Sequence, residues 1–148
     1  MQSLPLYELR QEEREGQRFL WGILRKKWLV AQPEEYVRQC LIRFLTEDRQ
    51  VPTGLMSVER GLKVAGGLRR RYDLVVYDRN AQPLICCECK APDVPIDQKA
   101  LRQLSIYNTK VGARHLLLTN GPQFYFLSPG AEGKLQVVPE MPVFLDLL

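Results

Sequence analysis

The chain has 148 residues, of which 45% are apolar and 26% charged, the balance of one globular domain, and this excludes a low-complexity chain. Its formal net charge of +4 permits a nucleic-acid partner without requiring one. No apolar run approaches the roughly 18 residues of a membrane span, and the first residues lack the apolar stretch of a signal peptide, so we expect a cytoplasmic protein without a membrane partner.

Residues 1–32 form a predicted N-terminal extension. Residues 1–16 are polar and charged, and we expect a short helix or a loosely held arm there. Two apolar stretches around Trp21 and Trp28 then predict short strands, or a strand and a turn. The basic run at residues 25–27 separates these stretches. A solvated surface and a nucleic-acid contact both stay open for it.

A helix is predicted to begin at Pro33, because proline suits the first helical position and the two following glutamates complement the helix dipole. Apolar residues recur at helical spacing along it: Val37, Leu41, Phe44 and Leu45. On a helical wheel Glu34 falls within this apolar stripe, whereas Glu35 points toward solvent. An inward carboxylate is costly unless it is paired or binds a cation, so Glu34 is a candidate site residue. A glutamate at an exposed helix end is the alternative.

The rest of the chain predicts an α/β layer. Strands are expected at residues 55–64, 70–78, 83–90, 114–120 and 123–128, with one more short strand in the tail. A second helix is predicted at 96–112, where Gly112 ends it. The nearly continuous apolar run at 114–120 indicates a buried central strand. We therefore predict a mixed β-sheet flanked by helices.

The strands at 70–78 and 83–90 form a predicted hairpin, in which the numbers of paired residues sum to about 161. That register places Asp73 opposite Glu88, and strand alternation puts Glu88 and Lys90 on one face. Neighbouring carboxylates repel each other unless a cation lies between them, and their hard oxygens suit Mg²⁺ or Mn²⁺. A lysine beside them is suited to assist a water or to offset charge on a phosphate. A charged strand that faces solvent is the alternative.

The same strand carries Cys86, Cys87 and Cys89. Alternation points Cys86 to one face and the other two to the opposite face, so an extended strand does not aim all three at one zinc ion. We interpret the thiols as small apolar residues that pack a central strand. His115 is interpreted as a structural histidine and not as a general base.

In the second helix Gln103 and Tyr107 are four residues apart, so they share a face. Ala100 and Leu104 lie on that face too, which is the side expected to pack on the sheet. An amide and a hydroxyl there would reach the rim of the carboxylate site. The alternative is an amphipathic helix with ordinary polar residues.

Four stretches spanning about residues 33–127 carry a family resemblance: PEEYVRQCLIRFL, RRRYDLVVYDRNAQPLICCECKAP, DQKALRQLSIYN and RHLLLTNG. Through them the chain resembles the PD-(D/E)XK nuclease superfamily, and more closely the N-terminal nuclease domain of type I restriction enzyme R subunits. The resemblance implies a restriction-endonuclease-like mixed β-sheet core flanked by helices. R subunits that translocate DNA carry ATP-driven motor domains, so the resemblance does not imply ATP-dependent restriction for this chain alone.

By this resemblance Asp73 and Glu88 are metal-ligand positions for Mg²⁺ or Mn²⁺, and Lys90 is the catalytic lysine. We add the backbone carbonyl of Cys89 as a further metal ligand, because backbone oxygen suits such ions.

The resemblance also assigns the helix residues. Gln103 and Tyr107 match the Q-x-x-x-Y motif of many of these nucleases, and with Arg71 we expect them to position the DNA backbone. Glu34 matches the first-helix glutamate of the superfamily, and Glu35 is the fallback.

These observations predict a single nuclease-like domain over residues 1–148, with an extension at 1–32, a core at 33–128 and a tail at 129–148. The expected activity is Mg²⁺-dependent hydrolysis of DNA phosphodiester bonds in restriction or defence, with little sequence specificity. We expect an endonuclease, and an exonuclease is the second option. The alternative is a catalytically silent nuclease-fold module for DNA binding or assembly. Expected partners are DNA and other subunits of a restriction system, and the oligomeric state stays open, with a homodimer as one option.

Overall fold

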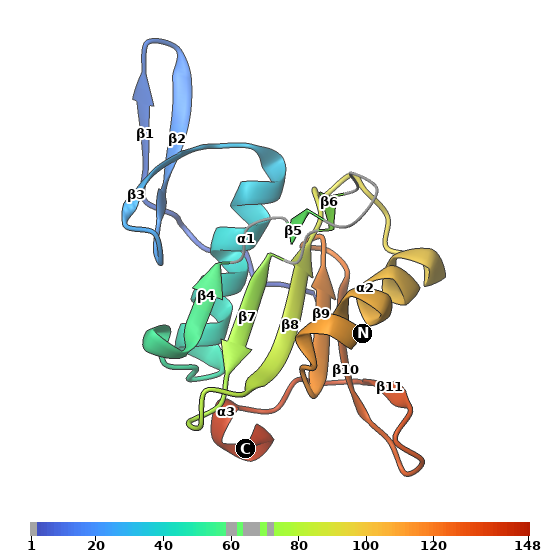
Figure 1. The fold of residues 1–148 in the computed structure, drawn as a ribbon. Coiled ribbons are helices and arrows are strands. Elements are labelled where there is room, and N and C mark those ends of the chain that lie inside the picture. Colours follow the sequence, from blue (N-terminus) through green and yellow to red (C-terminus); the bar gives the residue numbers. More distant parts are fainter. Residues whose placement is uncertain (1–2, 59–61, 64–68, 71–72) are drawn as a thin grey trace.

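The structure, a computed structural model, describes residues 3–58, 62–63, 69–70 and 73–148. Its main feature is a sheet in the order β11-β10-β9-β8-β7-β4 (Figure 1). These strands are β4 (Met56–Val58), β7 (Leu74–Tyr77), β8 (Pro83–Cys89), β9 (His115–Thr119), β10 (Phe124–Pro129) and β11 (Leu135–Val138). Strands β8 and β9 are parallel and the other neighbours antiparallel, so the sheet is mixed as predicted.

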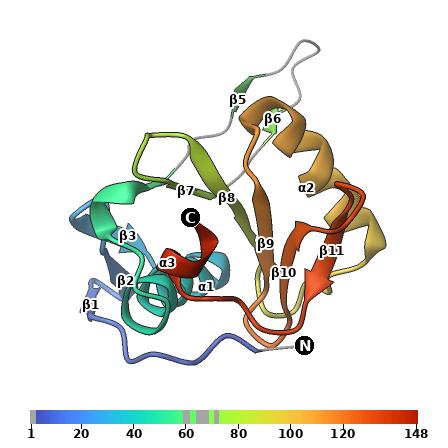
Figure 2. The ribbon, with the colours of Figure 1, turned by 90° about the horizontal axis from the view of Figure 1, so that it is seen from below.

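Helices cover both faces of this sheet. Figure 2 shows α1 (Pro33–Arg43) on one side and α2 (Gln98–Val111) on the other. The larger apolar cluster contains Leu41 of α1 with Leu117 of β9, and the smaller one contains Leu104 of α2 with Leu116. Because both faces are covered, β9 is buried along its whole length, as its apolar run predicted. The α/β architecture with flanking helices is confirmed.

The first helix begins at Pro33 as predicted, and the helix predicted at 96–112 spans Gln98–Val111. Pro33 opens α1, which continues through a π-helical turn at Phe44–Asp48. At the start of α2 the side chain of Asp97 accepts a hydrogen bond from the backbone of Ala100. Gly112 ends α2 in the left-handed conformation, with φ of 75°. A 3₁₀ turn at Thr53–Leu55 precedes β4, and a single-turn helix, α3 (Phe144–Leu147), lies near the C-terminus.

The N-terminal extension contains an antiparallel sheet: β1 (Gln11–Arg14), β2 (Gln17–Gly22) and β3 (Lys27–Val30). The strands around the two tryptophans were predicted, but the helix or loose arm expected at residues 1–16 is wrong where β1 forms. A turn at Glu15 and Gly16, both with positive φ, allows β1 to pair with β2. Polar side chains suit β1 because its residues are exposed or half-buried in a sheet with one solvated face.

The hairpin register is confirmed, since Leu74 pairs with Cys87 and Val75 with Cys86, each sum being 161. The strand predicted at 55–64 divides into β4, on the edge of the main sheet, and β5 (Leu62–Lys63), which pairs with β6 (Arg69–Arg70) in a separate two-stranded sheet. Residues 59–61 and 64–68 lie outside the described part of the chain. Within the described part of the chain, no helix is long and apolar enough to cross a membrane.

Candidate active site

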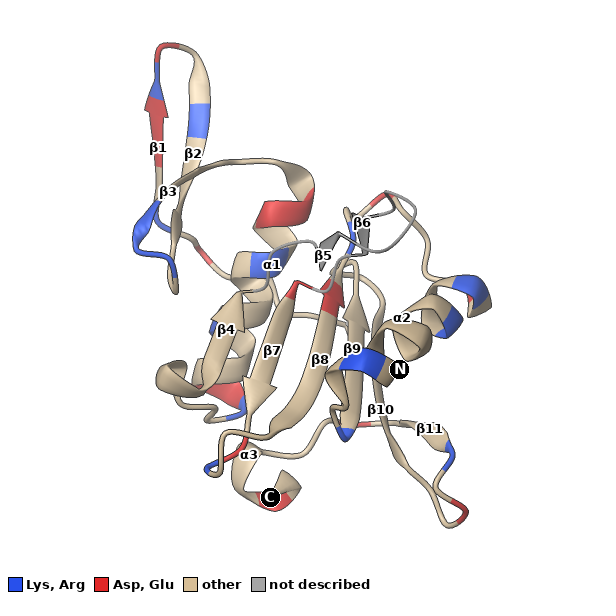
Figure 3. Ribbon diagram, viewed as in Figure 1, with Lys and Arg blue, Asp and Glu red and all other residues tan. Residues whose placement is uncertain are grey.

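Two buried carboxylates lie at the same end of neighbouring strands. Asp73 comes directly before β7 and is 5% exposed, and Glu88, near the end of β8, is 8% exposed. Figure 3 shows acidic residues at this end of β7 and β8, beside the acidic first turn of α1. Asp73 lies one residue beyond the paired stretch of β7, and its backbone N–H donates to the carbonyl of Cys87, the neighbour of Glu88, at 2.9 Å. The sheet therefore brings together two acids that are separated by 14 residues in the sequence.

Glu88 carries a charge that its surroundings only partly compensate. Burial raises the pKa of this carboxyl above its usual value, and the charges of Asp73 and Glu34 raise it further. Lys90 acts in the opposite direction, because its Nζ donates a hydrogen bond to Glu88 Oε1 at 3.3 Å. The net shift is upward. A second cation near Glu88 would therefore be favourable.

Asp73 is held more firmly than Glu88. Its Oδ2 accepts a hydrogen bond from the backbone N–H of Cys89 at 2.6 Å, across the hairpin. Its Oδ1 accepts one from the guanidinium of Arg38 at 2.6 Å. The side chain at the start of β7 thus reaches both the neighbouring strand and helix α1.

Arg38 is a site residue that the sequence reasoning missed. Its guanidinium bridges three acids, because besides Asp73 it contacts Glu35 at 2.7 Å and Glu34 at 3.1 Å. Burial by itself would lower the pKa of Arg38, but Asp73 and Glu35 outweigh burial and raise it, so the group stays charged. A signal was present: at 100° per residue Arg38 falls about 40° from Glu34, at the edge of the apolar stripe. An arginine at that position needs buried acidic partners.

The helical-wheel assignment of the two glutamates is wrong. We predicted Glu34 inward and Glu35 toward solvent, but the side chain of Glu34 is 39% exposed and that of Glu35 only 13%. The reason is that α1 packs against the N-terminal sheet as well as the main sheet, so it has more than one buried side. Gln39, on the Glu35 side, is fully enclosed and hydrogen-bonds both Glu35 and the backbone of Ile23. Both glutamates still contact Arg38 at the candidate site.

Comparisons with known proteins identify the family and the fold of this chain. The sequence profile of a family described as "Type I restriction enzyme R protein N terminus" matches residues 33–142. The chain belongs to this family. The match begins at the first residue of α1 and includes Asp73, Glu88 and Lys90, so the whole candidate site lies within the R protein N-terminal family region.

A solved structure shows the same fold. It is described as the fragment structure of a proposed HsdR subunit of a type I restriction enzyme from Vibrio vulnificus YJ016. The alignment covers 74% of this chain and 23% of that one, with a TM-score of 0.53 and 16% sequence identity. This member of the R protein N-terminal family therefore spans about a quarter of the subunit fragment that it matches. A search of curated proteins found no match.

The candidate site of this family member offers the type of ligand atom, carboxylate oxygen, that a hard divalent cation prefers. Asp73 and Glu88 supply buried carboxylate oxygens, and the raised pKa of Glu88 reflects negative charge that a cation would offset. Among the described residues, however, no three side chains of His, Cys, Asp or Glu are arranged to hold a metal ion together. In this structure the positive charge beside Asp73 comes from Arg38.

The remaining predicted residues lie farther along the fold. Gln103 is exposed and Tyr107 half-buried on α2, whose buried residues are Ala100 and Leu104. No described contact joins Gln103 to the carboxylates, so its role stays a prediction. Arg71 lies outside the described residues.

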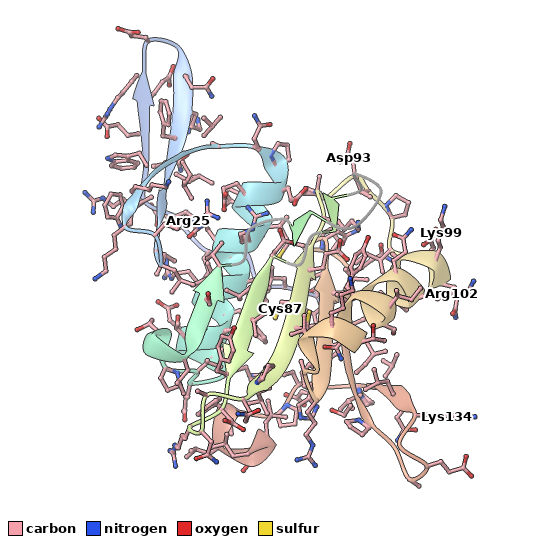
Figure 4. The ribbon with its side chains drawn as sticks, viewed as in Figure 1. Arg25, Cys87, Asp93, Lys99, Arg102 and Lys134 are labelled. Atoms are coloured by element: carbon pink, nitrogen blue, oxygen red, sulfur yellow. The ribbon has the colours of Figure 1, made fainter. Side chains whose placement is uncertain are left out.

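The cysteines and the histidine occupy the core. Cys86 packs in the cluster under α2, while Cys87 and Cys89 pack in the cluster on the α1 side, as strand alternation predicted. Figure 4 shows Cys87 within the sheet. Burial raises the pKa of the Cys87 and Cys89 thiols well above the usual value, so they stay protonated. His115 stacks on Phe126 at a ring distance of 5.3 Å, in keeping with a structural role.

Proposed function

We propose that this chain is a Mg²⁺- or Mn²⁺-dependent DNA nuclease domain of the restriction type. The observation that carries the proposal is the buried pair Asp73 and Glu88 at one end of the sheet, with Lys90 Nζ 3.3 Å from Glu88. Membership of the R protein N-terminal family supports a restriction-related nuclease. Endonucleolytic cleavage, cytoplasmic location, and DNA and restriction subunits as partners belong to the same proposal.

Each residue has a role that its position suits. Asp73, Glu88 and the carbonyl of Cys89 would hold the metal, and Glu34 would add negative charge at its edge. When bound, such a cation supplies charge neutralisation at a phosphate and lowers the pKa of water. Lys90 donates to Glu88 in this structure, and its ammonium is placed to orient a water or offset charge on the scissile phosphate. Gln103, Tyr107 and Arg71 would position the DNA backbone.

The test is cleavage of supercoiled plasmid and linear duplex DNA in Mg²⁺ or Mn²⁺, with a chelator as the blank. Lys90→Ala is expected to lower the cleavage rate about 100-fold or more, because a charge aimed at the reacting phosphate is lost. Lys134→Ala is the matched control, since Lys134 is exposed and lies on the β10–β11 turn, away from the carboxylate end of the sheet (Figure 4).

Cleavage that survives Lys90→Ala would contradict the catalytic role of this lysine. DNA binding without cleavage or metal affinity in the wild-type protein would favour the alternative, a silent nuclease-fold module for DNA binding or assembly. Binding is therefore measured separately by DNA mobility shift in the presence and absence of the metal.

A further inference from the structure

Arg38 lies where a cation bound to Asp73 would lie. One of its guanidinium nitrogens is 2.6 Å from Asp73 Oδ1, and the arginine side chain is only 14% exposed. The other oxygen of Asp73 is already held by the backbone of Cys89. Oδ1 is therefore the Asp73 oxygen that we consider as a metal ligand, and in this structure it is hydrogen-bonded to Arg38.

Asp73 Oδ1 has lone pairs for both a hydrogen bond and a metal ion, so a guanidinium and a metal ion compete at this atom through their charges. A divalent cation of the Mg²⁺ type approaches carboxylate oxygen to about 2.0–2.1 Å, well inside the contact that Arg38 makes. The two positive charges would also repel strongly at such a separation, because the site is shielded from water. Metal binding to Asp73 Oδ1 is thus most favourable when Arg38 has moved away.

The first turn of α1 provides a place for the displaced arginine. Arg38 already contacts Glu35 at 2.7 Å and Glu34 at 3.1 Å, three and four residues earlier on the helix. Glu35 is itself fixed, because its Oε2 accepts a hydrogen bond from Gln39 Nε2 at 3.0 Å. Gln39 in turn accepts one from the backbone N–H of Ile23 at 3.1 Å, so the N-terminal sheet supports the same network.

The Nε atom of Arg38 is buried and, among the described residues, has no hydrogen-bond partner. A buried donor without a partner is costly, so the guanidinium in its present position is incompletely satisfied. This favours a second position in which Arg38 leaves Asp73.

We propose that Arg38 is an internal counter-cation that occupies the metal position of Asp73 in the metal-free protein and shifts fully onto Glu34 and Glu35 when a divalent cation binds. The inference deepens the proposed function and rests on it, because it takes Asp73 as a metal ligand. It adds a residue that sets the metal affinity of the site. It also predicts opposite effects for two residues of one network.

The experiment is Mn²⁺ titration by calorimetry on the full chain, without DNA. Arg38→Met keeps the length of the side chain and removes the competing charge, so it is expected to bind Mn²⁺ about tenfold more tightly than wild type. Glu35→Gln removes the acid that receives the displaced arginine, so it is expected to bind Mn²⁺ more weakly. A purely structural role of Arg38 would not produce opposite shifts.

Arg43→Met is the matched control, because Arg43 is on the same helix but pairs with the exposed Glu47 at 2.9 Å. Its Mn²⁺ affinity is expected to equal that of wild type. If Arg38→Met does not fold, Glu35→Gln and Arg38→Lys carry the test, and Arg38→Lys is expected to keep the wild-type affinity within a few-fold because the competing charge remains.

Two failures are distinguishable. If wild type binds no Mn²⁺, or if Asp73→Asn binds it as wild type does, the metal assignment of the proposed function fails and the inference with it. If Asp73→Asn abolishes binding but folded Arg38→Met binds Mn²⁺ no more tightly than wild type, only the inference is overturned.

Discussion

At the scale of single residues, the buried ionisable groups differ in how well their charge is compensated. Asp73 has a guanidinium and a backbone N–H within 2.6 Å, whereas Glu88 has Lys90 at 3.3 Å and a raised pKa. The difference follows from their partners, because a guanidinium and a backbone N–H both stabilise the charged form of Asp73. Glu88 is the less compensated of the two carboxylates, in line with its raised pKa.

His115 gives the stability of this protein a specific pH dependence. It is the only histidine of the chain, it is 5% exposed, and burial, with help from Arg114, lowers its pKa from 6.5 to about 4. The folded state therefore resists protonation that the unfolded chain accepts. The resulting stability is complete above pH 6.5 and is lost as the pH falls toward 4.

The expected loss between pH 7 and pH 5 is on the order of 1–2 kcal/mol after allowance for solvent screening. Urea unfolding of wild type and His115→Phe at both pH values checks it. Phenylalanine keeps the stacking on Phe126 and removes the titrating group, so the variant should lose less stability than wild type on acidification. Equal losses in both proteins would show that other groups carry the pH dependence.

At the scale of elements, local signals in the sequence predicted the parts of the site that lie on the main sheet. The turn that joins β7 and β8 sets their register to within one residue. In it Asp78 Oδ1 accepts hydrogen bonds from the backbone of Asn80 and Gln82 at 2.8 and 3.0 Å, and a bulge between Val76 and Tyr77 then shifts the pairing. Strand alternation then gives the faces of β8. Both signals act over a few residues, which is why the pairing of β7 with β8 and the faces of β8 could be predicted from the sequence alone.

Arg38 could not be assigned in the same way, because its role depends on packing between distant elements. A helical wheel assumes one buried side, but α1 is covered by the main sheet and by β2 of the N-terminal sheet. The second contact encloses Gln39 and Glu35, which a single apolar stripe assigns to solvent. Only the assembled fold shows that the guanidinium meets Asp73, which lies 35 residues away.

The N-cap of α2 is a local feature whose contribution can be measured. Asp97 Oδ1 accepts a hydrogen bond from the N–H of Ala100 at 2.9 Å, so Asp97→Ala is expected to lower the free energy of unfolding by about 1 kcal/mol. Asp93→Ala is the control, because Asp93 is an exposed acid in the same connection between β8 and α2 (Figure 4). Urea unfolding at pH 7 compares the two variants. Equal midpoints would mean that the cap does not stabilise α2.

At the scale of the whole molecule, the N-terminal sheet belongs to the same core as the candidate site, although the family match begins only at residue 33. Leu4, Leu9 and Leu20 lie in the large apolar cluster together with Leu41 of α1 and Leu117 of β9. The backbone N–H of Leu4 also donates to the carbonyl of Gly121 at 2.8 Å, which ties the start of the chain to the β9–β10 turn. The extension and the core therefore support each other.

This shared core predicts that a substitution outside the family match destabilises the entire protein. Leu20 is 1% exposed, so Leu20→Ala should leave a cavity and lower the free energy of unfolding by about 2–5 kcal/mol. Leu6→Ala is the matched control, because Leu6 is 84% exposed and its truncation should change stability by less than about 0.5 kcal/mol.

Thermal unfolding followed by circular dichroism should show one transition that shifts as a whole in Leu20→Ala. If the sheet of residues 11–30 were an independent unit, Leu20→Ala would lower the temperature of a minor early transition and leave the main transition unchanged. The extension would then not stabilise α1 or its Arg38 network.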